Sequence, residues 1–282
     1  MIKIVTDTST LFSAEEGLKI GLHVVPLNIT IDDSSYRDLE DITSEELLEK
    51  IAQHHIPRTS QPSIGEKIDL YNELSQDNEV IDITLASGLS GTYHTALMAK
   101  ESSEHPERIH IVDAFTLCGP HRQMALKALE MANNGAAAEE IIAYLEDKKQ
   151  KETSFLIPLD FQFLLRGGRI NGVAAKLGGL LKLIPVMKKG ENGKGLDKFT
   201  VARTMKKAIS SVIEDMQNCG VTSDYNFYIS HAENIELAEK IKEKLTEKKD
   251  TELAETGESK ATEKEKAPAE EKPDASVKED EK

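Results

Sequence analysis

Strand-like and helix-like segments alternate along most of this chain, and this alternation restricts its fold more than any other feature. In the first half, the pattern predicts strands at 2–6, 23–31, 80–85 and 109–113. Helices are expected between them, two of which begin at the capping-box sequences Thr43–Glu46 and Ser63–Glu66. Because crossover helices join parallel strands, the alternation predicts an α/β fold with a parallel sheet.

A polar stretch at 148–151 marks an expected domain boundary. Beyond it, the pattern predicts strands at 154–159, 181–187 and 226–230, and helices at 161–165, 173–177, 204–216 and 235–245. The expected organisation is an N-terminal α/β domain at 1–151, a smaller α/β domain at 152–246 and a charged tail at 247–282.

The tail has almost no apolar side chains. Leu253 and Val277 are its large apolar residues, and 13 acidic residues against 8 lysines give it a net charge of −5. Such a segment cannot bury enough apolar surface to offset the entropy of ordering, so we expect it to be disordered, with transient helix in its Glu/Lys-rich part.

Composition excludes several classes of protein. No run approaches the roughly 20 apolar residues of a membrane span, so we expect no stable membrane insertion. The first residues are typical of a strand rather than of a secretory signal. Cys118 and Cys219 are too far apart for a CxxC motif. We therefore expect a cytoplasmic protein. A net charge of −15 argues against general nucleic-acid binding, although a local basic patch stays open.

The sequence also lacks the patterns of metal sites and of common catalytic motifs. The rings of His54 and His55 diverge because the residues are adjacent, and we expect His121 and His231 at the surface or at helix caps. Ser90 fails the nucleophile-elbow pattern since Thr92 replaces its last glycine, and the same loop has no P-loop lysine. We therefore expect no catalytic residue, no metal and no cofactor.

Two hydroxyl-rich loops are the informative motifs. One of them, Thr59-Ser60-Gln61-Pro62-Ser63, precedes an expected helix. The other, the loop at 86–92 with Ser87 and Ser90, joins an expected strand to a second expected helix. Helix starts present unpaired N–H groups, and small hydroxyl residues let an anion approach them. The two loops are either ordinary helix caps or a shared site for a carboxylate or phosphate.

The second half contributes basic and apolar residues. Arg169, in the turn at 166–170, and Arg203 are suited to binding a carboxylate or phosphate, or else cover the surface with their stems. The apolar residues form a core or, in part, the wall of a pocket for an apolar ligand; they are Phe155, Ile157, Phe161, Phe163, Leu164, Leu177, Leu180, Leu181 and Ile184.

Taken together, these residues resemble the DegV family of bacterial fatty-acid-binding proteins. The matching strings occur in family order over about 1–245 and include Thr6–Ser9, Val25–Leu27, Thr59–Pro62, Leu89–Tyr93, Gly167–Ile170, Pro185 and Arg203-Thr204. The resemblance implies a two-domain α/β protein that holds one long-chain fatty acid in an interdomain tunnel. It also implies that, as in some members of the family, the bound acid is presented to a separate fatty acid kinase that forms an acyl phosphate for phospholipid synthesis.

Carried over to this chain, the resemblance gives roles to individual residues. Thr59 and Ser87 match the hydroxyl positions that bind the carboxylate, with Ser60 and Ser90 beside them. Arg169 and Arg203 match basic positions suited to the kinase or the nascent phosphate.

The chain departs from the family pattern in three places. Ala86 replaces a serine, the segment 113–120 replaces a DS start and a glycine-rich turn, and the charged tail stands where the family has further strands and a His/Gly-rich segment. Two alternatives therefore remain: a degenerate paralogue with a scaffold role, and an enzyme acting on a small phosphorylated or carboxylated metabolite.

Overall fold

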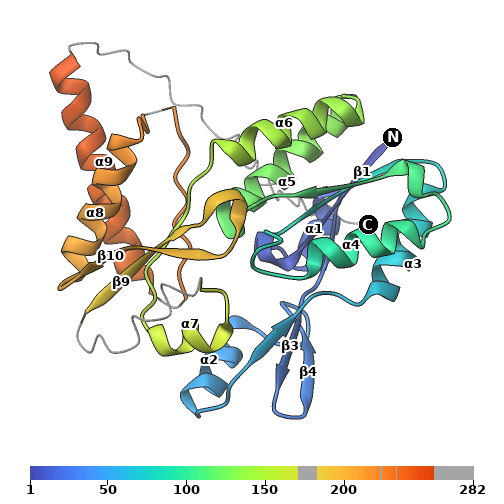
Figure 1. Cartoon of the computed structure of the whole chain (residues 1–282). Coiled ribbons are helices and arrows are strands. Elements are labelled where there is room, and N and C mark those ends of the chain that lie inside the picture. Colours follow the sequence, from blue (N-terminus) through green and yellow to red (C-terminus); the bar gives the residue numbers. More distant parts are fainter. Residues whose placement is uncertain (171–182, 223, 233, 257–282) are drawn as a thin grey trace, which may run out of the picture. The chain divides into compact units, whose positions relative to one another are not determined.

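The computed structural model describes residues 1–170, 183–222, 224–232 and 234–256 (Figure 1). Two compact units are present, and the first, Met1–Lys242, contains every sheet described below. The described part of the second unit continues the last helix of the chain.

The main sheet is entirely parallel, as the alternation predicts. Its strands are β1 (Ile2–Asp7), β2 (Leu22–Val25), β6 (Glu79–Thr84) and β7 (Ile109–Asp113), in the order β2-β1-β6-β7. The chain leaves β1 toward β2 and later returns to the other side of β1 as β6. The strand order therefore reverses between β1 and β6, the place where open α/β sheets bind ligands at their carboxyl ends.

Helices cover both faces of this sheet. Those of the first unit that pack on it are α1 (Ala14–Ile20), α3 (Ile64–Ser75), α4 (Thr92–Glu101), α5 (Cys118–Asn133) and α6 (Ala138–Gln150). Alternate residues of a strand point to opposite faces, so Ile4 packs with apolar residues of α5 and α6, and Val5 with those of α3 and α4. Both residues are fully buried, which places a core on each side of the sheet.

A small antiparallel sheet interrupts this arrangement. It consists of β3 (Asn28–Ile31), β4 (Ser34–Arg37) and β5 (Arg58–Ser60), in the order β4-β3-β5. The predicted single strand at 23–31 is therefore wrong: Pro26 has no N–H for a ladder, and the chain changes partners there from β1 to β4 and β5. Between β4 and β5, helix α2 (Ser44–Ala52) begins with the predicted capping box at Thr43 and Glu46.

The second half forms an antiparallel sheet. Its strands are β8 (Phe155–Leu156), β9 (Ile184–Lys189) and β10 (Leu196–Ala202), in the order β10-β9-β8, with helices α7 (Phe161–Gly167) and α8 (Met205–Asn218). The sequence pattern does not predict β10, whose polar residues obscure its alternation, and it predicts a longer β8. The expected helix at 173–177 and residues 181–182 of the expected strand lie outside the described residues.

The predicted strand at 226–230 is wrong. This segment has no regular secondary structure, and Phe227 and Tyr228 are 42% and 43% exposed. A strand needs a hydrogen-bonded neighbour, and no described strand pairs with this segment.

The last helix is longer than predicted. Helix α9 (Ile235–Thr256) passes the boundary expected at 246, because the Glu, Lys, Ala and Leu residues that follow are good helix formers. The remainder of the predicted tail, 257–282, lies outside the described residues.

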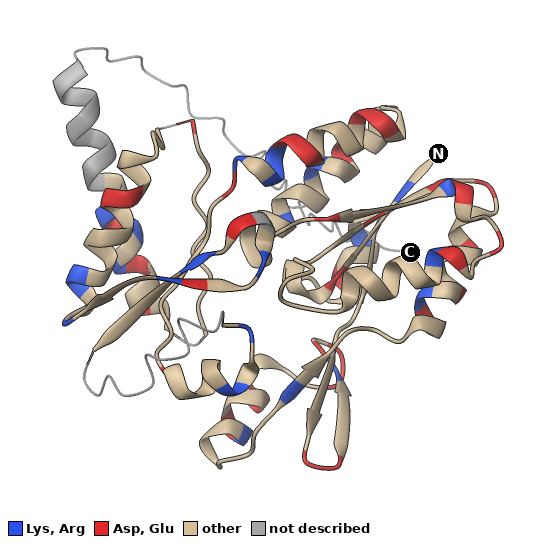
Figure 2. Ribbon diagram, viewed as in Figure 1, with Lys and Arg blue, Asp and Glu red and all other residues tan. Residues whose placement is uncertain are grey.

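Charges of both signs are distributed over the elements. Figure 2 shows acidic and basic residues interspersed, for example along α6, whose sequence contains three glutamates, one aspartate and two lysines. No helix within the described ranges has the length and apolar character needed to cross a bilayer.

Candidate functional site

Two buried carboxylates organise the carboxyl edge of the main sheet. Asp7 ends β1 and accepts hydrogen bonds from the amide of Leu85 at 2.9 Å and from that of Ser9 at 3.0 Å. Asp113 ends β7, and both its oxygens lie 3.2 Å from the amide nitrogen of Ser87. These side chains fix the loops that follow β1 and β6 at the point where the strand order reverses.

The loop after β6 carries two serines just before the start of α4. Ser87 is half-buried, and its hydroxyl has no hydrogen-bond partner among the described residues. Ser90 differs, since its Oγ lies 2.9 Å from Thr92 Oγ1 and accepts from the amide of Thr92 at 3.3 Å. Gly91 is the N-cap of α4 and has no side chain to act as a cap. Ser90 Oγ accepts from the first amide of the helix, that of Thr92, and the amides of Tyr93 and His94 that follow are suited to an anion.

The loop that carries Thr59 and Ser60 lies against the same helix start. A Cβ added to Gly91 would lie 3.1 Å from Oε1 of Gln61, which places the side chain of Gln61 directly on Gly91. The side-chain amide of Asn28 donates to the carbonyl of Gln61 at 3.1 Å and holds the loop in place. The two hydroxyl-rich loops are thus neighbours.

The local structure around Thr59 differs from the expected helix mouth. Thr59 and Ser60 are exposed residues of β5, paired with Ile29 and Asn28 of β3. The following helix, α3, is capped by Ser63, whose Oγ accepts from the amide of Glu66 at 3.2 Å. The two expected helix mouths therefore differ: the N-cap residue of α3 is a serine that caps the helix, whereas that of α4 is a glycine, and Ser90 Oγ accepts from the amide of Thr92 there.

The two predicted arginines occupy different places. Arg169 Nε donates to the carbonyl of Leu89 at 3.1 Å, which brings this arginine to the hydroxyl-bearing loop. Arg203 is exposed beside Thr204, the N-cap of α8, and makes no hydrogen bond or ion pair with that loop among the described residues.

The turn between β9 and β10 covers the loop after β6. A Cβ on Gly88 would collide with the carbonyl oxygen of Gly193 and would lie 2.7 Å from the amide nitrogen of Gly195. Gly193 itself has a φ of 69°, and a Cβ there would lie 2.8 Å from Cα of Phe115. Glycine is therefore required at 88 and 193 for this close approach of backbones.

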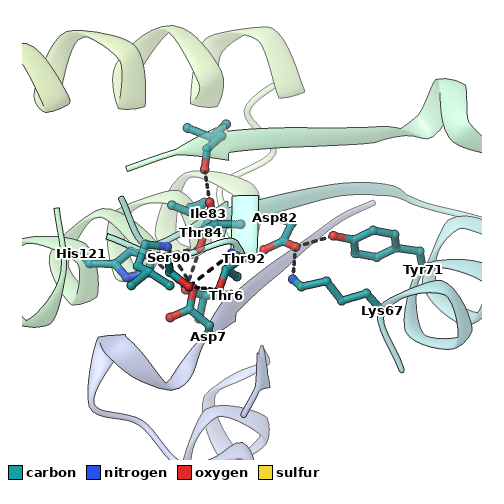
Figure 3. Close-up of polar contacts among 12 residues, drawn as sticks. Thr6, Asp7, Lys67, Tyr71, Asp82, Ile83, Thr84, Ser90, Thr92 and His121 are labelled. Carbon is teal, nitrogen blue, oxygen red and sulfur yellow. Dashed lines mark hydrogen bonds and ion pairs between the residues drawn. The ribbon is translucent and has the colours of Figure 1, made fainter. Parts of the chain in front are cut away.

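His121 is not at the surface, contrary to the expectation. Its ring is fully buried, with Nε2 2.9 Å from the carbonyl oxygen of Ile83 and 3.1 Å from Thr6 Oγ1 (Figure 3). Its Nδ1 lies 2.8 Å from Ser9 Oγ. A single histidine on an amphipathic helix gives no sign of such partners, because they come from distant strands. His231, by contrast, is exposed and accepts a hydrogen bond from the amide of Asn234 at 3.2 Å, as a local cap does.

A second buried polar group lies between α3 and β6. Lys67 Nζ is 2.5 Å from Asp82 Oδ2, the hydroxyl of Tyr71 donates to the same oxygen, and all three side chains are fully buried (Figure 3). Burial and the adjacent Asp82 raise the pKa of Tyr71 far above its ordinary value, so the phenol stays protonated and donates.

Burial also raises the pKa values of two groups near the carboxyl edge of the sheet, Asp38 and Cys118. It raises the pKa of Asp38, which accepts from Thr8 Oγ1 at 2.6 Å, and Asp7 raises it further, whereas the bond from Thr8 lowers it. Burial raises the pKa of the Cys118 thiol, so this cysteine is a poor nucleophile. The described residues contain no group of three metal-ligating side chains.

The apolar residues predicted as core or pocket divide into three sets. Phe155, Ile157 and Ile184 pack against the core of the second sheet, around Val186 and Ala208. Three residues of α7 are half-buried, namely Phe161, Phe163 and Leu164. Leu177, Leu180 and Leu181 lie outside the described residues.

Comparison with known proteins identifies the family. The profile described as "Uncharacterised protein, DegV family" matches residues 1–262. Protein DegV of Bacillus subtilis is 33% identical over 251 residues, which cover 88% of each chain.

Solved structures agree with this match. The crystal structure described as "DegV, a fatty acid binding protein from Bacillus subtilis" superposes with a TM-score of 0.73 at 32% identity over 88% of each chain. The structure described as "Fatty Acid Binding of a DegV family Protein from Thermus thermophilus" gives 0.69 at 31% identity over 77% of each chain. A DegV family protein from Streptococcus agalactiae, also described as fatty acid binding, gives 0.75 at 26% identity, over 91% of this chain and 88% of the other. The chain described here therefore belongs to the DegV family.

Proposed function

We propose that this protein binds one long-chain fatty acid and acts as a carrier without catalytic turnover of the lipid. The observation that carries the proposal is the adjacency of the two hydroxyl-rich loops at the start of α4, where the strand order reverses. Solved relatives at 31–32% identity are described as fatty acid binding, which supports the same ligand class.

In this proposal the carboxylate rests between Thr59 and Ser87. The unpartnered hydroxyl of Ser87 and the exposed hydroxyl of Thr59 are the donors, with Ser60 and Ser90 beside them. A carboxylate withdrawn from water needs such partners, because an unpaired charge costs more than a hydrocarbon chain readily offsets. The first-turn amides of α4 add the favourable end of the helix dipole.

The hydrocarbon chain supplies the driving force. Burying about 14 methylenes at ~0.8 kcal/mol each contributes roughly 11 kcal/mol before the cost of immobilisation. That cost is several kcal/mol, so the expected dissociation constant is about micromolar or tighter. The proposed tunnel lies between 1–151 and 152–246, with the half-buried apolar residues of α7 as part of its wall.

The arginines fit a later step of the same proposal. Arg169 lies on the carbonyl of Leu89, where a guanidinium meets a phosphate formed on the bound acid, and exposed Arg203 is available to a partner protein. That partner is proposed to be a fatty acid kinase that phosphorylates the presented carboxylate in the cytoplasm.

The head-group assignment is tested by isothermal titration calorimetry with oleate. The double variant Thr59→Ala, Ser87→Ala removes two donors to a charged group, at about 1–3 kcal/mol each, so its affinity should fall by roughly 30-fold or more. The control Ser35→Ala removes an exposed hydroxyl from β4 and should bind oleate as the wild-type protein does. Wild-type affinity in the double variant would exclude the proposed head-group site.

A further inference from the structure

Ser9 and His121 form a pair that fatty acid binding does not require. Ser9 is the middle residue of the 3-10 turn Thr8–Thr10 at the carboxyl end of β1, and it is half-buried. Its Oγ lies 2.8 Å from Nδ1 of His121, and that ring, at the start of α5, is fully buried.

The other ring nitrogen determines which atom of this pair carries the proton. His121 Nε2 is 2.9 Å from the carbonyl oxygen of Ile83, an atom that can only accept. In the neutral ring the hydrogen therefore lies on Nε2, and Nδ1 has a free lone pair. The hydroxyl of Ser9 is then the donor to Nδ1.

Thr6 lies at the same ring nitrogen as the carbonyl of Ile83. Thr6 Oγ1 donates to the same carbonyl of Ile83 at 2.9 Å and lies 3.1 Å from Nε2. Ser9 as nucleophile, His121 as base and the carbonyl of Ile83 as orienting group thus form the arrangement that activates a serine hydroxyl. Ser90 has no such base, because its oxygen faces the hydroxyl and amide of Thr92.

We propose that Ser9 is a nucleophile with His121 as its general base, and that the pair accepts an acyl group from an activated acyl ester. Ser9 Oγ attacks the carbonyl carbon while its proton passes to His121 Nδ1. The bond to the leaving group breaks, and the leaving group departs with the electron pair. The imidazolium then returns the proton to the leaving group or to water, and the product is an ester on Ser9 that water hydrolyses.

The experiment incubates the full chain with 4-nitrophenyl acetate. Release of 4-nitrophenolate gives the rate, and peptide mapping by mass spectrometry locates the acetyl group. The wild-type protein should carry it on Ser9, and Ser9→Ala should not. His121→Gln should react at least about 100-fold more slowly at Ser9, because its amide donates to the carbonyl of Ile83 without acting as a base. Ser35→Ala should match the wild-type rate.

A second variant leaves the buried ring unchanged and guards against misfolding of His121→Gln. In Ser9→Cys, the new thiol should be acetylated faster than exposed Cys219 in the same molecule. The proposal is overturned if Ser9 of the wild-type protein is not acetylated, or if folded His121→Gln is acetylated at the wild-type rate. It is also overturned if the new thiol of Ser9→Cys reacts no faster than Cys219. None of these readouts requires a bound lipid, so they are independent of the proposed carrier function.

Discussion

At the scale of single residues, the buried Lys67–Asp82 pair is the most consequential feature outside the carboxyl edge. Both side chains are fully buried, and Asp82 occupies the middle of a central strand. Its Oδ2 accepts from Lys67 and Tyr71, whereas Oδ1 has no partner among the described residues. The aspartate is therefore held by partners on one oxygen only, and the loss of either partner is costly.

The substitution Lys67→Met tests this dependence. It leaves a carboxylate buried without its counter-ion, and the free energy of unfolding should fall by about 3–5 kcal/mol. Adding Asp82→Asn removes the unpaired charge and should recover part of the loss. Urea denaturation, monitored by circular dichroism, gives the free energy of unfolding of the single and of the double variant. A single variant as stable as the wild-type protein would show that the ion pair contributes nothing to the fold.

At the scale of elements, the sequence predicts the parallel sheet well and the antiparallel parts poorly. Strands β1, β6 and β7 are rich in Ile and Val because helices cover both faces of the sheet, and such strands can be predicted without knowledge of their partners. Strands β5 and β10 are short or polar and exist because β3 and β9 pair with them. Strand pairing depends on tertiary structure. This also explains why the sequence pattern at 226–230 predicts a strand although the segment does not form one.

The candidate site shows the same division. The hydroxyl-rich loops can be found from the sequence alone, because small hydroxyl residues just before an expected helix are a signal within one short segment. The roles of Asp7, Asp113 and His121 could not be found in this way, since each contacts a loop or strand far away in the sequence.

Gly88 lies where the loop after β6 contacts the β9–β10 turn, and a side chain at this position should disturb that contact. In Gly88→Ala, the added methyl group meets backbone atoms of 193–195, which cannot rotate away, so the turn must shift. Oleate affinity should fall at least about tenfold, since a shift of the covering turn disturbs a site that must be preorganised. The matched control is Gly65→Ala in α3, where a Cβ meets nothing within 4 Å and a better helix former is gained. Equal oleate affinities in the two variants would show that the turn does not shape the site.

At the scale of the whole molecule, the proposed carrier function requires that the fold present one carboxylate-binding edge to a hydrocarbon ligand. The family membership, the strand-order reversal and the convergence of the two loops agree with this requirement. An enzyme for small metabolites and a scaffold without ligand are the alternatives, and neither is expected to retain a lipid through purification.

Native mass spectrometry of the full chain after gentle purification is therefore the decisive measurement. We expect a complex that carries one fatty acid of about 16–18 carbons, a length that supplies the burial energy calculated above. The lipid should be lost on denaturation and should be depleted in Thr59→Ala, Ser87→Ala. A wild-type protein that carries no lipid, and takes up none when oleate is added, would show that this protein is not a fatty acid carrier.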